Sequence, residues 1–395
     1  MKRATLGLAL LALAAPGCTK SQLVDIAMSG APHVPSATGM RVGGRLVLAG
    51  DMHCHVLPPD APYHVSRDLA GTIELAKQEG LDFVILTPHV PGRFFMDGEI
   101  RSWVLETQQA LRARLAALRP DLVVIPGFEY TDHHHGHVSV SFADLANVLH
   151  GFETAEAQAH PERFFERWVA QGGLITINHP VNRALENAPF AELRWDMSWR
   201  AFAGRDTPPE ITWITEHAQA VETFNVSVTH LRDQFLVGEE DRSLREAAHL
   251  VDRVSRAQHR RIAAVGGSDS HGRWLRATTF VLASERSAAA VREAIAAART
   301  CVRGPEACSL QARPRDHGEE GWRGVGDSFT TEAESLEARA SGGEVTYVVN
   351  GAIVARATSG QIVSLPIPAG RCAVVRAIVG RSWSSGMYVN CALTD

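Results

Sequence analysis

The chain has no run of more than two consecutive Lys and Arg residues, and its 39 basic residues against 44 acidic ones give a net charge of −5. Without a basic stretch, we do not expect nucleic acid as a partner. The chain also lacks a Gly-x-Ser-x-Gly motif, so no serine nucleophile is indicated. Its 45% hydrophobic and 21% charged residues exclude collagen-like, coiled-coil and wholly disordered chains.

A long apolar run is also missing, because the run from Leu6 to Ala15 is too short to span a bilayer comfortably. It follows the basic start Lys2-Arg3 and ends in Ala-Pro-Gly-Cys18, which resembles a bacterial lipobox. We therefore expect a lipoprotein signal peptide over 1–18, lipidation of Cys18, and contact with the membrane through the lipid anchor only. Thr19 does not favour inner-membrane retention, so we expect an outer-membrane lipoprotein facing the periplasm. Ordinary secretion, with Cys18 incidental, is the alternative.

Export makes disulfides plausible among the remaining cysteines. Cys301 and Cys308 bracket a Gly-Pro turn, and Cys372 and Cys391 flank a predicted strand–turn–strand. We expect bonds 301–308 and 372–391, although four cysteines allow three pairings. Cys54 is left over between two histidines and is expected to pack beneath them.

The rest of the chain divides by its periodicity into a tether over 19–43, an α/β part over 44–300 and a small β-sandwich-like part over 301–395. Short apolar strands alternate with amphipathic helices in the α/β part, which predicts a parallel, barrel-like sheet. The strands are expected at 45–50, 82–87, 122–126, 137–142, 174–178, 220–224, 262–265 and 279–283. The helices are expected at 67–78, 99–118, 161–170, 241–258 and 288–299. In the last part, 345–349 and 353–357 flank Asn350-Gly351 as a predicted hairpin.

Histidines gather where these strands end: eight of the 18 lie between residues 53 and 137. Strand ends of such a sheet meet at one face, where chemistry collects. The donors placed there are His53, His55, His89, Glu129, His137, His179, Asp269 and His271. Imidazole and carboxylate together favour divalent metals, and so many donors exceed the needs of one ion. We therefore predict two or three metals bridged by a carboxylate. Arg93 and Arg183, on loops at the same face, are candidates for substrate binding.

Taken together, DMHCH, TPH, PGFEYT, GHVSV, INHP and GSDSH resemble the PHP (polymerase and histidinol phosphatase) metallohydrolases, and most of all their CehA/McbA-like branch. The resemblance covers about residues 45–300 in the right order. It implies a distorted (βα)7 barrel holding two or three zinc, manganese or iron ions. The family usually has Asp at the position of Pro88.

Carried over by position, the resemblance assigns each candidate ligand to a metal. His53, His55, Glu129 and Asp269 would hold the first ion, Glu129, His137 and His179 the second, and Asp60, His89 and His271 the third. His64 is an alternative to Asp60, and His133, His134 and His135 are alternatives to His137.

The predicted function is metal-dependent hydrolysis by a metal-activated water, with no protein nucleophile assigned. A small phosphomonoester or phosphodiester is the first expectation for the substrate. A carbamate, ester or amide hydrolase of the same family is the second. A non-catalytic, metal-containing binding lipoprotein is the third.

Overall fold

The computed structural model describes residues 28, 37, 39–62, 64–186, 194–203, 207–233, 238–276, 278–315 and 317–394. The predicted signal peptide with Cys18, and most of the predicted tether, lie outside these residues. Among the described helices, none is both long enough and apolar enough to cross a membrane.

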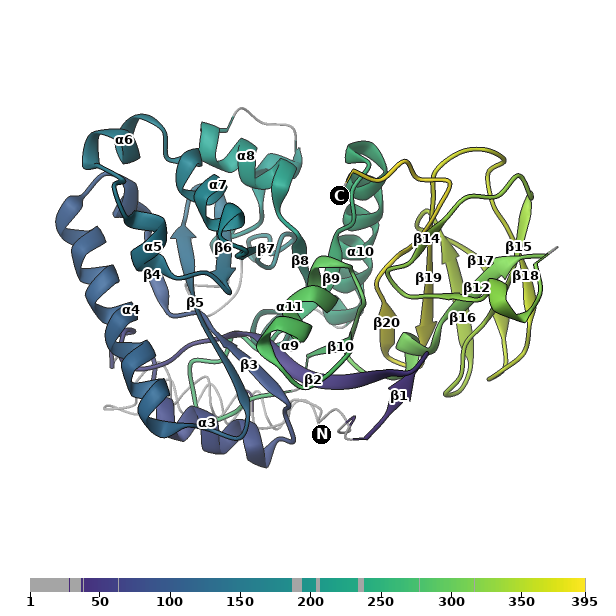
Figure 1. Cartoon of the computed structure of the whole chain (residues 1–395), viewed down its shortest axis with the longest axis horizontal. Helices are drawn as coiled ribbons and strands as arrows, with labels where there is room; N and C mark the ends of the chain where they lie inside the picture. Colours follow the sequence, from purple (N-terminus) through teal and green to yellow (C-terminus); the bar gives the residue numbers. More distant parts are fainter. Residues whose placement is uncertain are drawn as a thin grey trace.

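A curled sheet forms the first part of the molecule (Figure 1). Its backbone pairings run from strand to strand in the order β10–β2–β3–β5–β6–β7–β8–β9, with β4 beside β5. A bridge between Cys54 and Ser270 brings the end of β2 next to the segment after β9. The strands are β1 (Arg41–Val42), β2 (Arg45–Cys54), β3 (Phe83–Leu86), β4 (His89–Pro91), β5 (Val123–Asp132), β6 (Gly136–Ser141), β7 (Leu174–Ile177), β8 (Ala220–Asn225), β9 (Ala263–Gly267) and β10 (Thr279–Ala283).

Several helices of this part begin next to a polar side chain that caps them. Asp68, Asp97 and Ser287 each accept a hydrogen bond from a backbone N–H of the first turn of α3, α4 and α11. The helical segments are α3 (Leu69–Gln78), η1 (Gly92–Phe95), α4 (Gly98–Leu118), α5 (Leu145–Leu149), α6 (Thr154–Ala159), α7 (Glu162–Ala170), η3 (Arg200–Ala203), α8 (Pro209–His217), α9 (Val226–Asp233), α10 (Glu239–Gln258) and α11 (Ala288–Ala296).

The predicted fold class, an α/β barrel followed by an all-β part, is confirmed. The barrel is distorted because β6 and β10 run antiparallel to their neighbours. The apolar runs FVIL of β3 and LITI of β7 are fully buried, as expected for strands covered on both faces.

Two sheets face each other in the C-terminal part, at the right of Figure 1. One contains β12 (Gln311–Pro314), β13 (Arg323–Gly324), β15 (Ser335–Arg339) and β18 (Val363–Pro366). The other contains β14 (Ser328–Phe329), β16 (Val345–Val349), β17 (Ala352–Ala357), β19 (Ala373–Val379), β20 (Ser382–Ser384) and β21 (Met387–Val389). Short helical turns lie at η4 (Glu306–Ser309) and η5 (Glu319–Gly321). Leu336 from the first sheet and Tyr347 and Val375 from the second share one apolar core.

The hairpin predicted around Asn350-Gly351 is present, with φ of 51° and 85° at the two turn residues. Both values are positive, which a two-residue type I′ turn requires and Asn-Gly tolerates.

The two parts of the chain share a continuous backbone ladder. β11 (Thr300–Val302) pairs with β10 on one side and with β20 on the other. Disulfide bonds join Cys301 to Cys308 and Cys372 to Cys391, the pairing that the spacing predicted.

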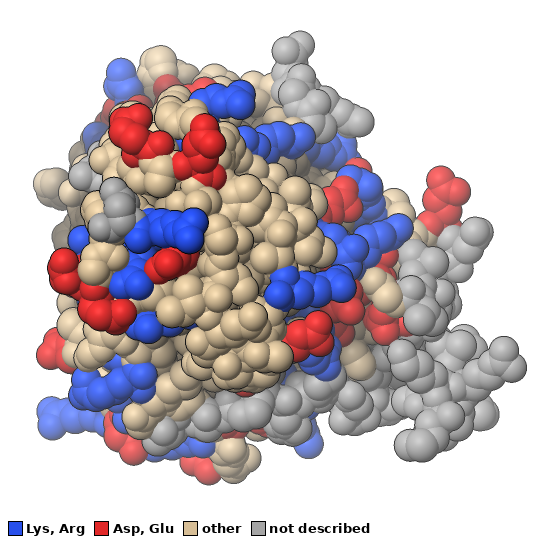
Figure 2. Space-filling view, turned by 90° about the vertical axis from the view of Figure 1, so that its right-hand side faces the viewer, with Lys and Arg blue, Asp and Glu red and all other residues tan. Residues whose placement is uncertain are grey.

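Viewed from the C-terminal strands, the surface has a broad area without charged side chains, bordered by residues of both signs (Figure 2).

Candidate metal centre

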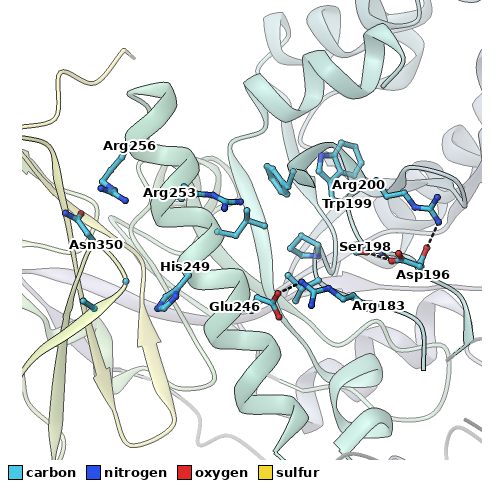
Figure 3. Close-up of a pocket in the computed structure, with 16 residues that line it drawn as sticks. Arg183, Asp196, Ser198, Trp199, Arg200, Glu246, His249, Arg253, Arg256 and Asn350 are labelled. Atoms are coloured by element: carbon cyan, nitrogen blue, oxygen red, sulfur yellow. Dashed lines mark hydrogen bonds and ion pairs between the residues drawn. The ribbon is translucent and has the colours of Figure 1, made fainter. Parts of the chain in front are cut away.

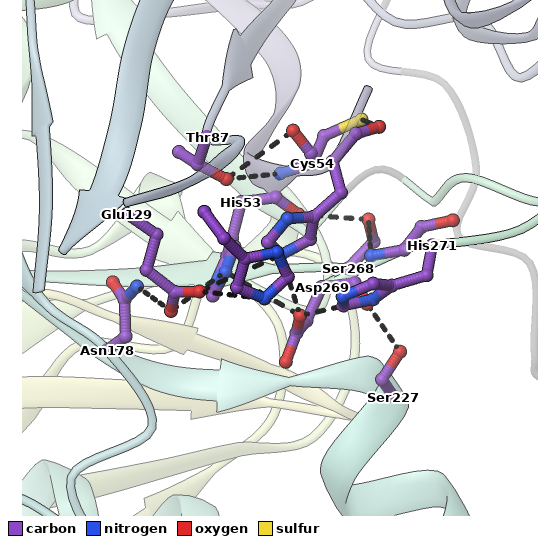
Figure 4. A network of polar contacts seen from close by, with 12 residues as sticks. His53, Cys54, Thr87, Glu129, Asn178, Ser227, Ser268, Asp269 and His271 are labelled. Carbon is purple, nitrogen blue, oxygen red and sulfur yellow. Dashed lines mark hydrogen bonds and ion pairs between the residues drawn. The ribbon is translucent and has the colours of Figure 1, made fainter. Parts of the chain in front are cut away.

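The side chains predicted as metal ligands gather at one end of the curled sheet (Figure 4). His53 lies on β2, Glu129 on β5 and His137 on β6, while His179 follows β7 and Asp269 follows β9. They are nearly all buried, but the side chains of His89 and His271 keep 26% and 25% of their surface exposed. A small molecule would therefore reach the centre from the side of His89 and His271.

Glu129 lies at the middle of this cluster. Its two oxygens have imidazole nitrogens within 3.3 to 3.8 Å, from His53, His55, His89, His137 and His179. Burial alone would raise the pKa of Glu129, but positive charge on His53 and His137 holds it well below its ordinary value. The carboxylate is therefore ionised, which is the form that binds cations.

Asp269 is the second buried carboxylate of the cluster. Its Oδ1 lies 3.2 Å from Nε2 of His55 and 3.6 Å from Nε2 of His53. Burial would raise its pKa, but attraction to His53 and a hydrogen bond with His55 hold it well below the ordinary value. Two ionised carboxylates thus face the same group of imidazoles.

Three sets of side chains in the described structure have donor atoms close enough together to hold a metal ion. In each set, these atoms lie within 4.8 Å of one another. The sets are His53, His55 and Asp269; Glu129, His137 and His179; and His55, His89 and His271. This grouping parallels the three sites implied by the sequence resemblance, with His55 shared between two sets.

Unpartnered nitrogens supply a test of whether these residues fit metal ions. Nε2 of His53, Nε2 of His137 and Nδ1 of His179 are buried and have no hydrogen-bond partner among the described residues. Buried polar atoms without partners are rare and costly. A divalent cation coordinated by these nitrogens would satisfy them, so the donor set fits such ions.

The backbone at two candidate ligands is strained in the way that functional sites tolerate. His179 and Asp269 have φ of 27° and 52°, in the left-handed region that residues other than glycine seldom adopt.

Close packing requires glycine at position 267, where a Cβ would lie 2.2 Å from Oε1 of Glu222 and from Cβ of His53. Only glycine lets β9 approach β2 this closely.

Glu222 was missed in the sequence, yet it holds several parts of the centre. Its Oε1 lies 3.2 Å from Nδ1 of His53, and its Oε2 accepts from the backbone N–H of His179 at 2.8 Å and from Asn225 at 3.1 Å. A carboxylate bound to the second nitrogen of a metal-binding imidazole fixes the orientation of the ring. The sequence contained one indication of its role, because a Glu stands in the middle of the predicted buried strand 220–224.

Two asparagines orient the carboxylates and were also missed. Nδ2 of Asn178 donates to Oε1 of Glu129 at 2.7 Å, and Nδ2 of Asn225 donates to Oδ2 of Asp269 at 3.1 Å. Each amide therefore leaves its carboxylate charged while fixing its rotation. Asn178 sits inside the INHP motif, so its position beside His179 was the signal.

Asp60 lies between two imidazoles. Its carboxylate is 3.2 Å from Nδ1 of His55 and 2.7 Å from Nδ1 of His89, and it also accepts from the backbone N–H of His89. These contacts orient the rings so that Nε2 of each faces Glu129. Direct ligation by Asp60 stays a prediction. The alternative, His64, contacts the ring of His89 at 5.8 Å between centroids.

Cys54 points away from the donors and into the apolar core. Burial raises the pKa of its thiol to about 12. Nη2 of Arg67 lies 3.1 Å from Sγ, and its positive charge opposes this rise in pKa. The thiol is therefore protonated and is no nucleophile. The side chain of Arg67 also donates to the backbone oxygens of His55 and Gly272 and thereby joins two ligand-bearing segments.

The two arginines predicted to bind substrate lie apart from this cluster. The side chain of Arg183 is 66% exposed and is paired with Glu246, and Arg93 is exposed in η1. Within the described residues, no hydrogen bond or ion pair joins either arginine to a candidate ligand. Their role in substrate binding stays a prediction.

Comparison with known proteins shows only distant likeness. No model of a protein family matches the chain, and no curated protein matches it. Among solved structures, a two-domain protein from Bacteroides vulgatus containing a predicted PHP-like metal-dependent phosphoesterase is similar at 16% identity and a TM-score of 0.43, covering 91% of this chain and 98% of that one.

Two further similar structures come from other organisms. A lesion-specific endonuclease from Pyrococcus furiosus is 13% identical, with a TM-score of 0.34 over 63% of this chain and 56% of that one. An amidohydrolase from Chromobacterium violaceum is 15% identical, with a TM-score of 0.32 over 57% of this chain and 88% of that one. At such identities and scores, likeness says nothing about the reaction.

Proposed function

We propose that this protein is a metal-dependent phosphoesterase of the PHP type, most like its CehA/McbA branch. The observation that carries the proposal is the buried, ionised Glu129 with five imidazole nitrogens within 3.8 Å of its oxygens. Two or three divalent ions held there would make hydroxide available near neutral pH and neutralise charge on the substrate.

Charge balance favours a phosphate ester as the substrate. The cluster offers three carboxylates, Glu129, Asp269 and Asp60, and its other donors are imidazoles. With Glu222, which contacts His53, the centre has four carboxylates, so two divalent cations would balance their charge and three would leave a positive site. Such a site favours an anionic phosphoryl group over a neutral carbamate or amide.

Neighbouring side chains hold the candidate metal ligands in place. Glu222 and Asp60 fix the rings of His53, His55 and His89, while Asn178 and Asn225 fix the two carboxylates. The open side at His89 and His271 admits the substrate. No protein nucleophile is assigned, in keeping with the protonated state of Cys54.

Turnover and metal content of the purified protein test the proposal together. Metal-replete protein is expected to carry at least one equivalent of zinc, manganese or iron and to hydrolyse p-nitrophenyl phosphate or its bis-ester. Asp269→Asn should lose metal and turnover because it removes an anionic ligand. Asp121→Asn, the same change at an 80% exposed carboxylate, should lose neither.

Other results would contradict the proposal in separate ways. Turnover of aryl carbamates without turnover of phosphoesters would favour the second predicted activity. Metal-loaded protein that is inert on both classes would favour a binding lipoprotein. Less than one equivalent of metal would reject the metal centre itself.

We also propose that the protein is exported and anchored by lipid at Cys18, facing the periplasm. The support is the basic start, the short apolar run and the Cys that ends it. Cys18→Ser should move the protein from the membrane fraction to the soluble fraction while metal content stays the same. An unchanged distribution between the fractions would reject the anchor.

A further inference from the structure

A concave site lies along α10 and is lined in part by the residues that directly follow His179. Its floor is one face of α10, and its walls are the chain after β7 and the turn at Asn350 (Figure 3). The cavity measures about 1000 Å³, at the upper end of the volumes of small-molecule sites. We call it the α10 trough. Pro180 and Val181 line it, but no candidate metal ligand does.

Arginines dominate the charge of the trough. Arg253 and Arg256 come from α10, and Arg183 and Arg200 come from the opposite wall. Both line the trough, and Figure 3 shows Arg256 on the side of α10 toward Asn350 and Arg253 directed toward the opposite wall. The trough is thus basic on a chain whose net charge is −5.

The two carboxylates in the trough neutralise little of this charge. Glu246 is paired with Arg183, and Asp196 accepts from the backbone N–H and hydroxyl of Ser198. Among the described residues, Arg200, Arg253 and Arg256 form no ion pair with a carboxylate. Nη2 of Arg200 donates to the backbone oxygen of Asp196 at 3.4 Å, so its positive charge, like the charges of Arg253 and Arg256, has no carboxylate partner among the described residues.

Two of these guanidinium groups have unsatisfied donors. The Nε atoms of Arg200 and Arg256 are buried and lack a hydrogen-bond partner within the part of the chain that the structure describes. Because these Nε atoms are buried, an anion in the trough would meet the terminal amino groups of the guanidinium groups instead. Guanidinium groups match phosphate and carboxylate oxygens in geometry as well as in charge.

We propose that the α10 trough binds a small organic polyanion, a molecule with at least two phosphate or carboxylate groups, at a site separate from the metal centre. One anionic group would meet Arg256 and another would meet Arg253. The cavity has room for the molecule that joins them. This inference does not depend on the proposed hydrolysis, because binding here requires no turnover.

Calorimetric titration of the metal-loaded protein with naphthalene-1,3,6-trisulfonate tests the site. This rigid trianion is a useful probe because sulfonates are weak ligands for metals. We expect saturable one-to-one binding that weakens as salt is added. Arg253→Gln should weaken it about tenfold or more, the cost of one charge-assisted contact. Ala352→Glu, which places a negative charge at the trough wall, should weaken it similarly.

Arg245→Gln is the matched control, since Arg245 is an exposed arginine of α10 outside the trough. It should leave the affinity unchanged. Equal weakening by Arg245→Gln, competition between the probe and p-nitrophenyl phosphate, which carries a single phosphate and reports on the metal centre, or no saturable binding would each overturn the proposal.

Displacement of the bound probe identifies the anionic group. Release by fructose 1,6-bisphosphate would assign the trough to phosphates, and release by tricarballylate would assign it to carboxylates. If neither compound displaces the probe, the proposed ligand class is wrong.

Discussion

At the scale of single residues, the candidate centre depends on side chains that do not face the substrate. Glu222 is 2% exposed and contacts His53, the backbone of His179 and Asn225, which in turn contacts Asp269. One carboxylate thus orients donors that belong to different sets. Its charge also strengthens the hydrogen bond to the imidazole of His53.

Glu222→Gln is therefore expected to weaken metal binding by about 10- to 100-fold while the fold is kept, because the side chain keeps its shape and loses its charge. Competition with a chromogenic chelator measures the affinity, and turnover should recover when metal is added in excess. Glu293→Gln, at an exposed glutamate of α11, is the control and should behave as wild type. Unchanged affinity in Glu222→Gln would show that His53 needs no such support.

The strand pattern predicted the positions of the donors, while their grouping around ions came only from the family resemblance. His53, Glu129 and His179 could be found because each lies at or near the end of a recognisable buried strand. Which donors share an ion depends on side-chain rotamers and on the curl of the sheet, which strand patterns do not encode. For the same reason, the contacts of Asp60 with His55 and His89 had no signal in the strand pattern, and its ligation of a metal stays a prediction.

At the scale of elements, hydrophobic patterns located strands and helices but not strand direction. β10 occupies the predicted residues 279–283, and α10 begins only two residues before its predicted start. A buried strand has the same apolar pattern whether its neighbours run parallel or antiparallel. The reversed directions of β6 and β10 therefore had no local signal.

Contacts between elements were likewise invisible in the sequence, and one of them is a buried ion pair. Asp252 of α10 pairs with Arg376 of β19, and both side chains are 2% exposed. Burial raises the pKa of Asp252, although the positive charge of Arg376 opposes the rise. The folded state thus binds this proton more tightly than the unfolded state, so Asp252 favours folding at low pH. That contribution is lost as pH rises from the ordinary value of 3.8 through the higher pKa of the folded state.

Arg376→Met should lower the free energy of unfolding by about 3 to 5 kcal/mol at pH 7.5, because it leaves a buried carboxylate without its cation. The loss of unfolding free energy should be smaller at pH 5. Without the positive charge of Arg376 the pKa of Asp252 rises further, so Asp252 takes up a proton at this pH. Urea denaturation at both pH values measures this difference. The double variant Arg376→Met/Asp252→Asn should recover much of the stability, and equal losses at both pH values would contradict the argument.

At the scale of the whole molecule, the candidate centre joins distant parts of the chain. His55 and Asp269 are 214 residues apart and lie 3.2 Å from each other. Glu129, His137 and His179 come from the chain between them. Ions held at this point would link the strands of the curled sheet to one another. The two disulfides lie outside this part, on the C-terminal strands and beside them.

Removal of metal should therefore lower the stability of the barrel while both disulfides remain intact. Ions that bind only the folded state add about 2.7 kcal/mol when their free concentration is a hundredfold above the dissociation constant. Scanning calorimetry of wild type treated with a chelator, without reductant, is expected to show a lower melting temperature that returns when zinc or manganese is restored. His53→Ala, which lacks a ligand and the ring that faces Glu129 and Asp269, should melt at a temperature that no longer responds to chelator. An unchanged melting temperature in wild type, with metal loss verified by elemental analysis, would show that the donors are held together by protein contacts alone.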